Sequence, residues 1–294
     1  MEKRLLGCNL CGSKQFSVLF PDELGDNAPP VNYDFSPETR KTFQIVKCNC
    51  CNLVYTNPMP CLGVAYTESC DEVYLASESQ RVFTAQKLIA KILQFEKTGA
   101  LLDVGCATGI FLDVASKHFA VEGLELSKWA GQRASRNHKV HRVPLSELKA
   151  SGKFDVVTLL GVIEHFEDPI AEMARVNGLL KPDGLVVVYT GDLSAWLPRL
   201  LGKKWWWFQG MYLYYFSRHT LSRLLEQCGF TVVGTGTHTV YFQLFSLLTS
   251  LRRYRFASVV APILEAGPIR DLMIPLRISG EMLMFARKAK QLEG

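Results

Sequence analysis

The chain has 294 residues, of which 48% are hydrophobic and 21% charged, a balance typical of globular and not of disordered proteins. Its net charge of +5 at pH 7 is too mild to argue for nucleic acid as a partner. No apolar run is long enough for a bilayer, and the first residues lack the apolar core of a signal peptide. We therefore expect a cytoplasmic protein whose nine cysteines are reduced thiols or metal ligands.

Two C-x-x-C pairs lie near the N-terminus, Cys8 with Cys11 and Cys48 with Cys51. Two such turns can present four thiolates tetrahedrally, which is the geometry of a structural Zn²⁺ site. Residues 16–20 and 42–46 are predicted as strands beside these turns, so residues 1–60 are expected to form a zinc ribbon. Buried free cysteines are the alternative, and Cys50 could replace a neighbouring ligand.

Residues 61–97 are predicted to connect the ribbon to a larger domain. Within them, residues 61–79 have the composition of a linker, whereas apolar residues at helical spacing predict one amphipathic helix over 81–95. Tyr74 and Arg81 could reach a ligand site in the next domain, although such residues more often pack or face solvent.

A strand, a tight glycine loop and a helix start follow one another in residues 101–109. Gly105 and Gly109 bracket the loop, where a ligand can approach backbone that carries no Cβ. The free N–H groups at the helix start favour an anionic or polar ligand group. Asp103 would repel a phosphate but suits a cationic group, and Ala107 stands where a dinucleotide fingerprint has its second glycine.

This loop resembles the first motif of class I S-adenosylmethionine (SAM)-dependent methyltransferases, D/E-x-G-x-G-x-G, with Ala107 at the central glycine. The resemblance implies that Asp103 and the loop, including Cys106, hold the methionine part of SAM. Glu125 ends the next predicted strand, where a carboxylate can accept hydrogen bonds from ribose hydroxyls; the alternative is a solvated charge at a strand end. Leu126 and Leu145 are the further expected cofactor contacts, Leu145 through its backbone to adenine.

The segment from 153 to 189 gives the most specific match to the same class, because a buried strand, an Ile-Glu-His turn, an Asp-Pro helix start and another strand follow in order. Gly161 is an expected cofactor contact at the end of the first of these strands. His165 is the catalytic candidate. It could act as a general base, as a positioning residue or as a structural histidine, and these alternatives stay open.

Aromatic residues gather in residues 190–216, above all in 205–208 and 211–216. We interpret this segment as a lid that shapes an acceptor pocket and excludes water. A membrane-facing patch of tryptophans beside lysines and plain core packing are the rivals. Residues 241–276 are predicted as an apolar helical insert facing an oligomer partner or a membrane, and residues 281–287 as a final antiparallel strand.

Apolar strands that alternate with helices predict an α/β fold, with a Rossmann-like, doubly wound, mostly parallel seven-stranded sheet in residues 98–294. The resemblance implies transfer of a methyl group from SAM to oxygen or carbon of a small-molecule, sugar or other glycan-type, or lipid-linked acceptor. Its kin include quinone-type O-methyltransferases. One alternative is an RNA methyltransferase, which the modest basic charge of the ribbon disfavours. Another is a non-catalytic scaffold of the same fold. Oligomerisation and peripheral contact with the inner face of a membrane are further hypotheses.

Overall fold

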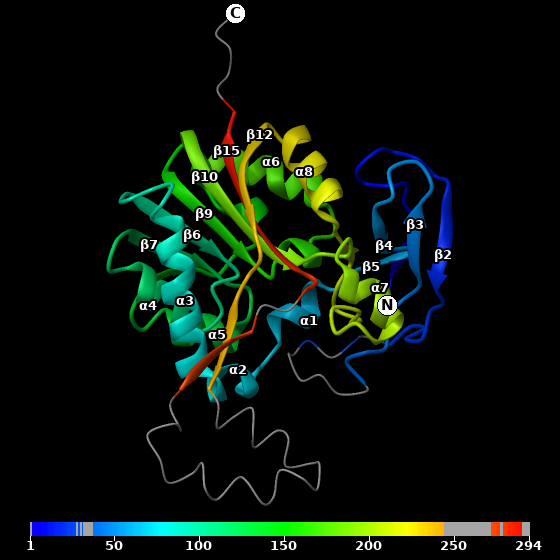
Figure 1. Ribbon diagram of the computed structural model, residues 1–294, viewed down its shortest axis with the longest axis horizontal. Coiled ribbons are helices and arrows are strands. Elements are labelled where there is room, and N and C mark those ends of the chain that lie inside the picture. Colours follow the sequence, from blue (N-terminus) through cyan, green and yellow to red (C-terminus); the bar gives the residue numbers. More distant parts are fainter. Residues whose placement is uncertain are drawn as a thin grey trace, which may run out of the picture.

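The computed structural model describes residues 2–27, 29, 31, 38–243, 272–276 and 279–289. Figure 1 shows a large α/β domain with the N-terminal module, in blue, packed beside it. The strands of the central sheet are β6 (Ala100–Val104), β7 (Ala120–Leu124), β8 (Lys139–His141), β9 (Phe154–Leu160), β10 (Leu180–Gly191), β12 (Phe230–Gly236) and β15 (Glu281–Lys288).

The central sheet has the order β12-β15-β10-β9-β6-β7-β8. Its neighbours pair in parallel except at β15, which is antiparallel to both β10 and β12. The chain runs outward from β6 in one direction through β7 and β8, and in the other through β9 and β10. The order therefore reverses between β6 and β9, where open α/β sheets bind their ligands. The predicted doubly wound, mostly parallel seven-stranded sheet is confirmed.

Helices cover both faces of this sheet. Successive side chains of β6 enter two different cores because neighbouring strand residues point to opposite faces of the sheet. Leu101 packs in one core and Leu102 in the other. The core on one face contains apolar residues of α3 and α4, and the core on the other contains those of α6 and α8. These helices, with α5, are α3 (Glu78–Ile92), α4 (Ile110–Ala115), α5 (Lys128–Ala134), α6 (Pro169–Leu179) and α8 (Arg218–Gln227).

Side-chain caps set the starts of three helices. The side chains of Ser127, Asp168 and Ser217 accept backbone N–H groups at the starts of α5, α6 and α8. Each cap satisfies a donor that the first helical turn leaves without an intrahelical partner.

Residues 61–79 are more ordered than a linker. They form α1 (Gly63–Thr67) and α2 (Glu72–Ala76), and Asp71 caps α2 by accepting the N–H of Tyr74. The hydroxyl of Ser127 donates to the carbonyl of Ser69 at 2.8 Å, which ties this segment to the start of α5. The segment is thus held against the edge of the large domain.

The N-terminal module is a small antiparallel sheet that the rest of the chain completes. Its strands are β2 (Phe16–Phe20), β3 (Ile45–Cys48) and β4 (Val54–Thr56), with β1 (Lys3–Arg4) pairing β5 (Met59–Pro60) beside them. The order β11-β4-β3-β2 adds a fourth strand, β11 (Tyr214–Tyr215), from the aromatic segment. The ribbon and the large domain also share one apolar core.

The aromatic segment, residues 190–216, is largely buried and includes α7 (Trp196–Leu201) and the short turn η3 (Gly202–Lys204). Trp205, Trp207 and Phe208 expose 7% of their surface or less and pack with Ile45 and Val54 of the ribbon. The alternative that residues 205–208 form a membrane-facing patch is therefore wrong, because these rings form an internal core.

The remaining short elements are the turns η1 (Leu145–Glu147) and η2 (Ile163–His165) and the paired strands β13 (Val240–Gln243) and β14 (Met273–Leu276). The predicted helical insert over 241–276 thus begins and ends in strand, and its residues 244–271 lie outside the described residues. Among the helices described, none is long and apolar enough to cross a membrane.

Candidate active site

A cavity of about 1300 Å³ opens at the carboxyl edge of the parallel strands. It exceeds the roughly 300–1,000 Å³ of an ordinary single-ligand pocket, so it has room for two ligands side by side. The predicted site residues that line it are Gly105, Ala107, Glu125, Leu126, Leu145, Gly161 and His165.

The glycine loop adopts backbone conformations that favour residues without a large side chain. Gly105 has a φ of +71°, and a Cβ there would lie 2.6 Å from a methyl group of Val162. Gly109 caps α4 with a φ of +92°, and its missing Cβ leaves room for Ala134. Ala107 takes a φ of 47° in place of the expected glycine, and it lines the cavity. The loop therefore offers its backbone to a ligand at 105 and 107 and uses Gly109 for packing.

Glu125 clamps this loop from the end of β7. Its Oε2 accepts the N–H of Ala107 at 2.8 Å, and its Oε1 accepts the N–H of Ser127 at 2.7 Å. Burial raises the pKa of this carboxyl, and the backbone hydrogen bonds oppose that rise. Each carboxylate oxygen keeps a second lone pair for a ligand hydroxyl. Glu125 is thus a partly buried, organised carboxylate rather than a solvated charge.

Asp103 and Cys106 do not line the cavity. The Oδ1 atom of Asp103 accepts the hydroxyl of Thr158 at 2.6 Å, and burial raises the pKa of its carboxyl to about 7. The thiol of Cys106 is buried against Leu112 and Ala134. Both side chains therefore support the loop from behind the cavity wall. Their predicted contact with a cofactor stays a prediction.

Two residues ahead of the glycine loop also face the cavity. The guanidinium of Arg81 lies 3.7 Å from the ring centre of Tyr74, and both residues line the cavity wall. Burial raises the pKa of Tyr74 to about 12, with the charges of Asp103 and Glu125 contributing. The sequence identified these two residues only as able to reach the site.

A continuous row of rings forms another wall of the cavity. Each ring contacts the next, with centroid separations of 5.2, 5.0, 5.2, 5.9 and 4.1 Å. All six residues line the cavity, and we call them the aromatic row: Tyr66, His165, Tyr212, Trp207, Tyr189 and His238. The aromatic segment thus shapes a pocket, as predicted for a lid, but from a buried position.

His165 is held within this row by two neighbours. Its Nδ1 lies 2.8 Å from the hydroxyl of Tyr66 and 3.1 Å from the carbonyl of Met211, to which Tyr66 also donates. Because a carbonyl can only accept, Nδ1 carries the ring proton. Burial lowers the pKa of His165 to about 4, so the imidazole is neutral at pH 7 and a weak base. The geometry therefore favours a positioning role over general-base catalysis.

Sequence reasoning missed Glu281 as a cavity residue and treated it only as the start of the last strand. Glu281 is 6% exposed and lines the cavity. Because β15 runs antiparallel, its first residue lies at the edge where the parallel strands end. An acidic residue opening an otherwise apolar antiparallel strand was the signal that could have identified it.

Four cysteines converge in the ribbon. The sulfurs of Cys8, Cys11, Cys48 and Cys51 all lie within 4.8 Å of one another, and two of their separations are 3.4 and 3.5 Å. Four thiolates around one tetrahedral Zn²⁺ lie about 3.8 Å apart, since each Zn–S bond is about 2.3 Å. Cys50 is exposed, and its thiol donates to Ser13 outside this group. The cluster fits the ion, and Cys50 is not part of it.

Comparison with known proteins places this site in context. The profile of a family described as "Methyltransferase domain" matches residues 77–235. A ubiquinone biosynthesis O-methyltransferase of Cereibacter sphaeroides is 28% identical over 116 residues, which cover 36% of this chain and 47% of that protein. The protein of the same name from Psychrobacter arcticus is 33% identical over 102 residues, covering 31% and 40%. The chain thus spans about half or less of these curated relatives.

Solved structures share the fold. A SAM-dependent methyltransferase from Archaeoglobus fulgidus superposes with a TM-score of 0.51 at 16% identity, over 74% of this chain and 100% of that one. Magnesium protoporphyrin IX methyltransferase from Synechocystis PCC 6803 with bound SAH, the demethylated form of SAM, gives 0.50 at 15% identity, over 75% and 89%. At these identities the likeness concerns the fold alone.

Proposed function

The chain belongs to the class I SAM-dependent methyltransferases, and we propose that it methylates a hydroxyl oxygen of a small molecule. The observation that carries this proposal is the single cavity in which the glycine loop and Glu125 share a wall with the aromatic row. One end offers backbone and a carboxylate, and the other offers rings. A donor and an acceptor can therefore bind next to each other.

The cofactor end holds SAM through residues that line the cavity. The backbone at Gly105 and Ala107 faces the methionine part, and Glu125 accepts ribose hydroxyls while holding the loop closed. Leu126 and Leu145 border the adenine, and Gly161 leaves room at the end of β9. Asp103 and Cys106 act through the loop that they support. The buried hydroxyl oxygen of Thr108, without a partner among the described residues, is a further group available to this ligand.

When bound, SAM supplies an electrophilic methyl group on a positively charged sulfur. Displacement at that carbon needs the acceptor oxygen in line, so most of the catalytic work is orientation. The aromatic row excludes water and offers ring faces and edges against which an acceptor can pack. His165, fixed by Tyr66 and Met211, positions this wall.

Methylation of oxygen on a small molecule is supported by the relatives, whose names describe O-methyltransferases of ubiquinone biosynthesis. A non-catalytic scaffold is disfavoured by the family assignment. The ribbon belongs with the catalytic domain in this proposal, because residues 1–60 and 98–294 share a core and a sheet.

We further propose that Cys8, Cys11, Cys48 and Cys51 bind one structural Zn²⁺. With four sulfur ligands the ion has no open position, so it stabilises the ribbon and takes no part in methyl transfer.

The test begins with calorimetric titration of the zinc-loaded protein with SAM and with SAH. We expect both to bind with one site per chain. Incubation with SAM and a panel of phenols, sugars and amines, followed by mass spectrometry, then identifies the methylated atom class. Transfer to oxygen of a phenol or sugar supports the proposal, and transfer to nitrogen or carbon alone contradicts it.

A further inference from the structure

The cavity contains a buried carboxylate, that of Glu281, which has no role in the proposed function. We propose that Glu281 accepts the hydroxyl proton of the acceptor, and that this acceptor is a hydroxylated aromatic ring lying against the aromatic row. The inference rests on the proposed O-methylation and names the residue and the substrate class of that same cavity.

The sheet places Glu281 beside the rings. In the antiparallel pair of β10 and β15, Glu281 lies directly opposite Gly191. A Cβ on Gly191 would lie 2.9 Å from atoms of both Trp205 and Trp207. The indoles therefore fill the space that this glycine leaves on the sheet, next to the Glu281 side chain.

Beside the aromatic row, three buried polar atoms of the cavity wall have no hydrogen-bond partner among the described residues. They are Glu281 Oε2, Gln209 Oε1 and the indole nitrogen of Trp207. The three residues expose 6%, 1% and 7% of their surfaces. Leaving such groups unpaired costs about 1–3 kcal/mol each, so a bound molecule that pairs them gains affinity and orientation. Two acceptors and one donor match a molecule that carries hydroxyl groups.

The neighbouring surface is aromatic, with Trp207 and Tyr212 stacked at an interplanar angle of 29° and Tyr189 edge-on to Trp207 at 76°. Tyr189, Trp207 and Tyr212 contact one another in sequence along the aromatic row, and Trp206 also lines the cavity. Rings of this kind favour stacking with another ring. A planar ring carrying a hydroxyl group satisfies both the stacking surface and the buried polar atoms, whereas a saturated sugar satisfies only the second.

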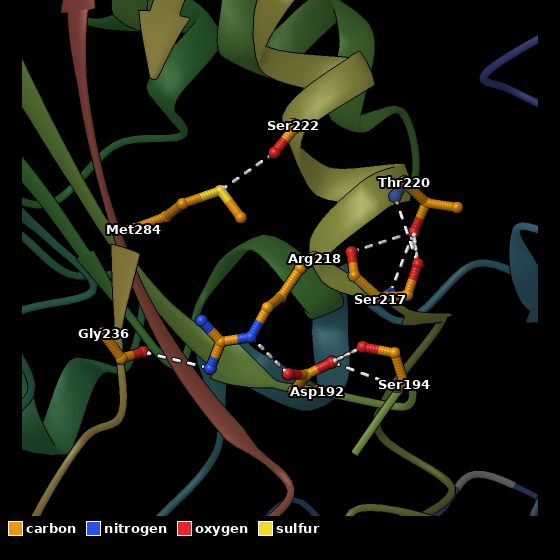
Figure 2. A network of polar contacts seen from close by, with 8 residues as sticks. All are labelled: Asp192, Ser194, Ser217, Arg218, Thr220, Ser222, Gly236 and Met284. Carbon is orange, nitrogen blue, oxygen red and sulfur yellow. Dashed lines mark hydrogen bonds and ion pairs between the residues drawn. The ribbon is translucent and has the colours of Figure 1, made fainter. Parts of the chain in front are cut away.

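The start of β15 is fixed by a polar network. Figure 2 shows Arg218, the first residue of α8, bridging the carboxylate of Asp192 and the carbonyl of Gly236. The backbone N–H of Asp192 in turn donates to the carbonyl of Gly280 at 2.7 Å. The residue before Glu281 is thus anchored to both β10 and α8, which preorganises the carboxylate.

The charge state of Glu281 suits a base near neutral pH. Burial raises the pKa of its carboxyl to about 7, and the polar groups of Tyr189, Trp206 and Trp207 oppose that rise. The other titratable side chains of this wall are Tyr66 of α1, His165 of η2, Tyr189 of β10, Tyr212 of the aromatic segment and His238 after β12, with Lys91 of α3 next to His238. Burial lowers the pKa of His238 to about 4, so it is neutral where Glu281 titrates.

Methyl transfer from SAM to the acceptor hydroxyl needs no further reactant. A bond forms between the acceptor oxygen and the methyl carbon while the carbon–sulfur bond breaks and its electron pair stays on sulfur. The hydroxyl proton passes to the Glu281 carboxylate and is later released to water.

The experiment uses the full chain loaded with zinc, and Glu281→Gln, which keeps the shape of the side chain but cannot take a proton. Glu226→Gln, on the exposed surface of α8, is the matched control. Catechol and 4-hydroxybenzoate are the probes, glucose is the non-aromatic comparison, and quenching of tryptophan fluorescence reports probe binding. SAH affinity and thermal unfolding confirm that each variant is folded.

We expect the aromatic probes, and not glucose, to quench fluorescence and to be methylated by the wild type. Glu281→Gln should bind SAH and probe within a few-fold of wild type while kcat falls about 10²–10⁴-fold. The wild-type rate should rise with pH through about 7, and this rise should be absent in the variant.

Unchanged kcat in Glu281→Gln would overturn the role of the carboxylate. Two outcomes would overturn the aromatic acceptor while leaving the proposed function standing. In both, the wild type binds SAM; it then either methylates glucose alone or shows no response to either aromatic probe. Absence of SAM binding by the wild type would instead reject the proposed function, and this inference with it.

Discussion

The two ends of the cavity are built in different ways. The cofactor end comes mainly from two short stretches, residues 103–109 and 125–127, joined by hydrogen bonds between a carboxylate and nearby backbone. The acceptor end gathers single side chains from α1, β10, the aromatic segment and β15. The first is a local motif, and the second exists only when distant parts of the chain have folded together.

The ligand affinity of each end of the cavity therefore depends on different parts of the chain. Damage to one residue of the cofactor end should weaken one ligand, because the rest of the motif is held by its own strand and loop. The acceptor end, in contrast, should respond to changes far away, such as in the ribbon that packs on the aromatic segment.

The largest effect is expected from loss of the zinc site. Chelation of the metal, or Cys51→Ser, should destabilise the protein by at least about 3 kcal/mol, because structural zinc contributes its binding free energy to folding. Since β11 pairs with the ribbon strand β4, acceptor binding should be lost before SAH binding. Thermal unfolding and the two binding assays, with metal content measured in parallel, check this.

Cys50→Ser is the matched control, because Cys50 lies in the same turn but outside the sulfur cluster. It should keep its metal and its stability. If Cys51→Ser lost SAH and acceptor binding together at every temperature, the two ends would not be separable in the way described.

A smaller effect, confined to the cofactor end, is expected for Glu125→Gln. Charge-assisted hydrogen bonds contribute about 1.5–3 kcal/mol, so SAH affinity should fall about 10–100-fold while the fluorescence response to catechol is kept. Calorimetry compares the SAH affinity of this variant with that of Glu122→Gln. Glu122 lies in β7, and its carboxylate pairs with His141 and Lys153 away from the cavity. Equal affinities in both variants would remove Glu125 from the cofactor site.

Glu164 links the pH dependence of stability to the acceptor end. Burial raises its pKa from 4.5 to about 8, so between these values the folded protein holds a proton that the unfolded chain releases. Stability is therefore fully present below the unfolded pKa and is lost as pH rises toward 8. The buried carboxyls of Asp103 and Glu281 act with the same sign. His165 acts with the opposite sign, but only below its ordinary pKa of 6.5.

Between pH 6.5 and 8 the wild type should lose about 1–2 kcal/mol of stability through Glu164 alone. Glu164→Gln should flatten this part of the curve and unfold at a higher temperature than wild type at pH 8. Denaturant unfolding at several pH values measures the slope. A slope in the variant as steep as in the wild type would show that Glu164 is ionised in the folded protein.

The smallest effect is expected for Tyr66→Phe, which removes the hydroxyl that holds His165. One hydrogen bond contributes about 0.5–1.5 kcal/mol, so kcat/KM for catechol should fall roughly 2- to 12-fold with SAH affinity unchanged. Tyr74→Phe, at the other end of the cavity, keeps its ring over Arg81 and should leave the acceptor kinetics as they are. The opposite pattern would reverse the assignment of the two ends.

The elements that the sequence predicted well are those specified by local chemistry. The doubly wound sheet followed from apolar strands that alternate with helices. Helix starts are equally local: α8 begins directly after Ser217, because a capping hydroxyl and helical periodicity act within a few positions. The strand, loop and acid around Gly105 and Glu125 were predicted in the same way, and all but Asp103, Cys106 and Gly109 of the expected cofactor residues line the cavity.

The features that the sequence left open depend on pairing between distant segments. Residues 205–208 have the composition of a lid, a membrane patch or a core, and only their packing on Ile45 and Val54 decides among these. Glu281 begins an apolar strand, but its place at the cavity follows from the antiparallel direction of β15 and from the space left at Gly191. No local pattern encodes either relation.

The strand that β11 lends to the ribbon has an evolutionary consequence. A zinc module with its own complete sheet could be moved between genes and attached to many enzymes. Here the module borrows two residues, Tyr214 and Tyr215, from the chain that builds the acceptor wall. Substitutions that adapt this wall to another acceptor must also preserve the pairing of β11 with β4. The acceptor wall and the ribbon must therefore diversify together.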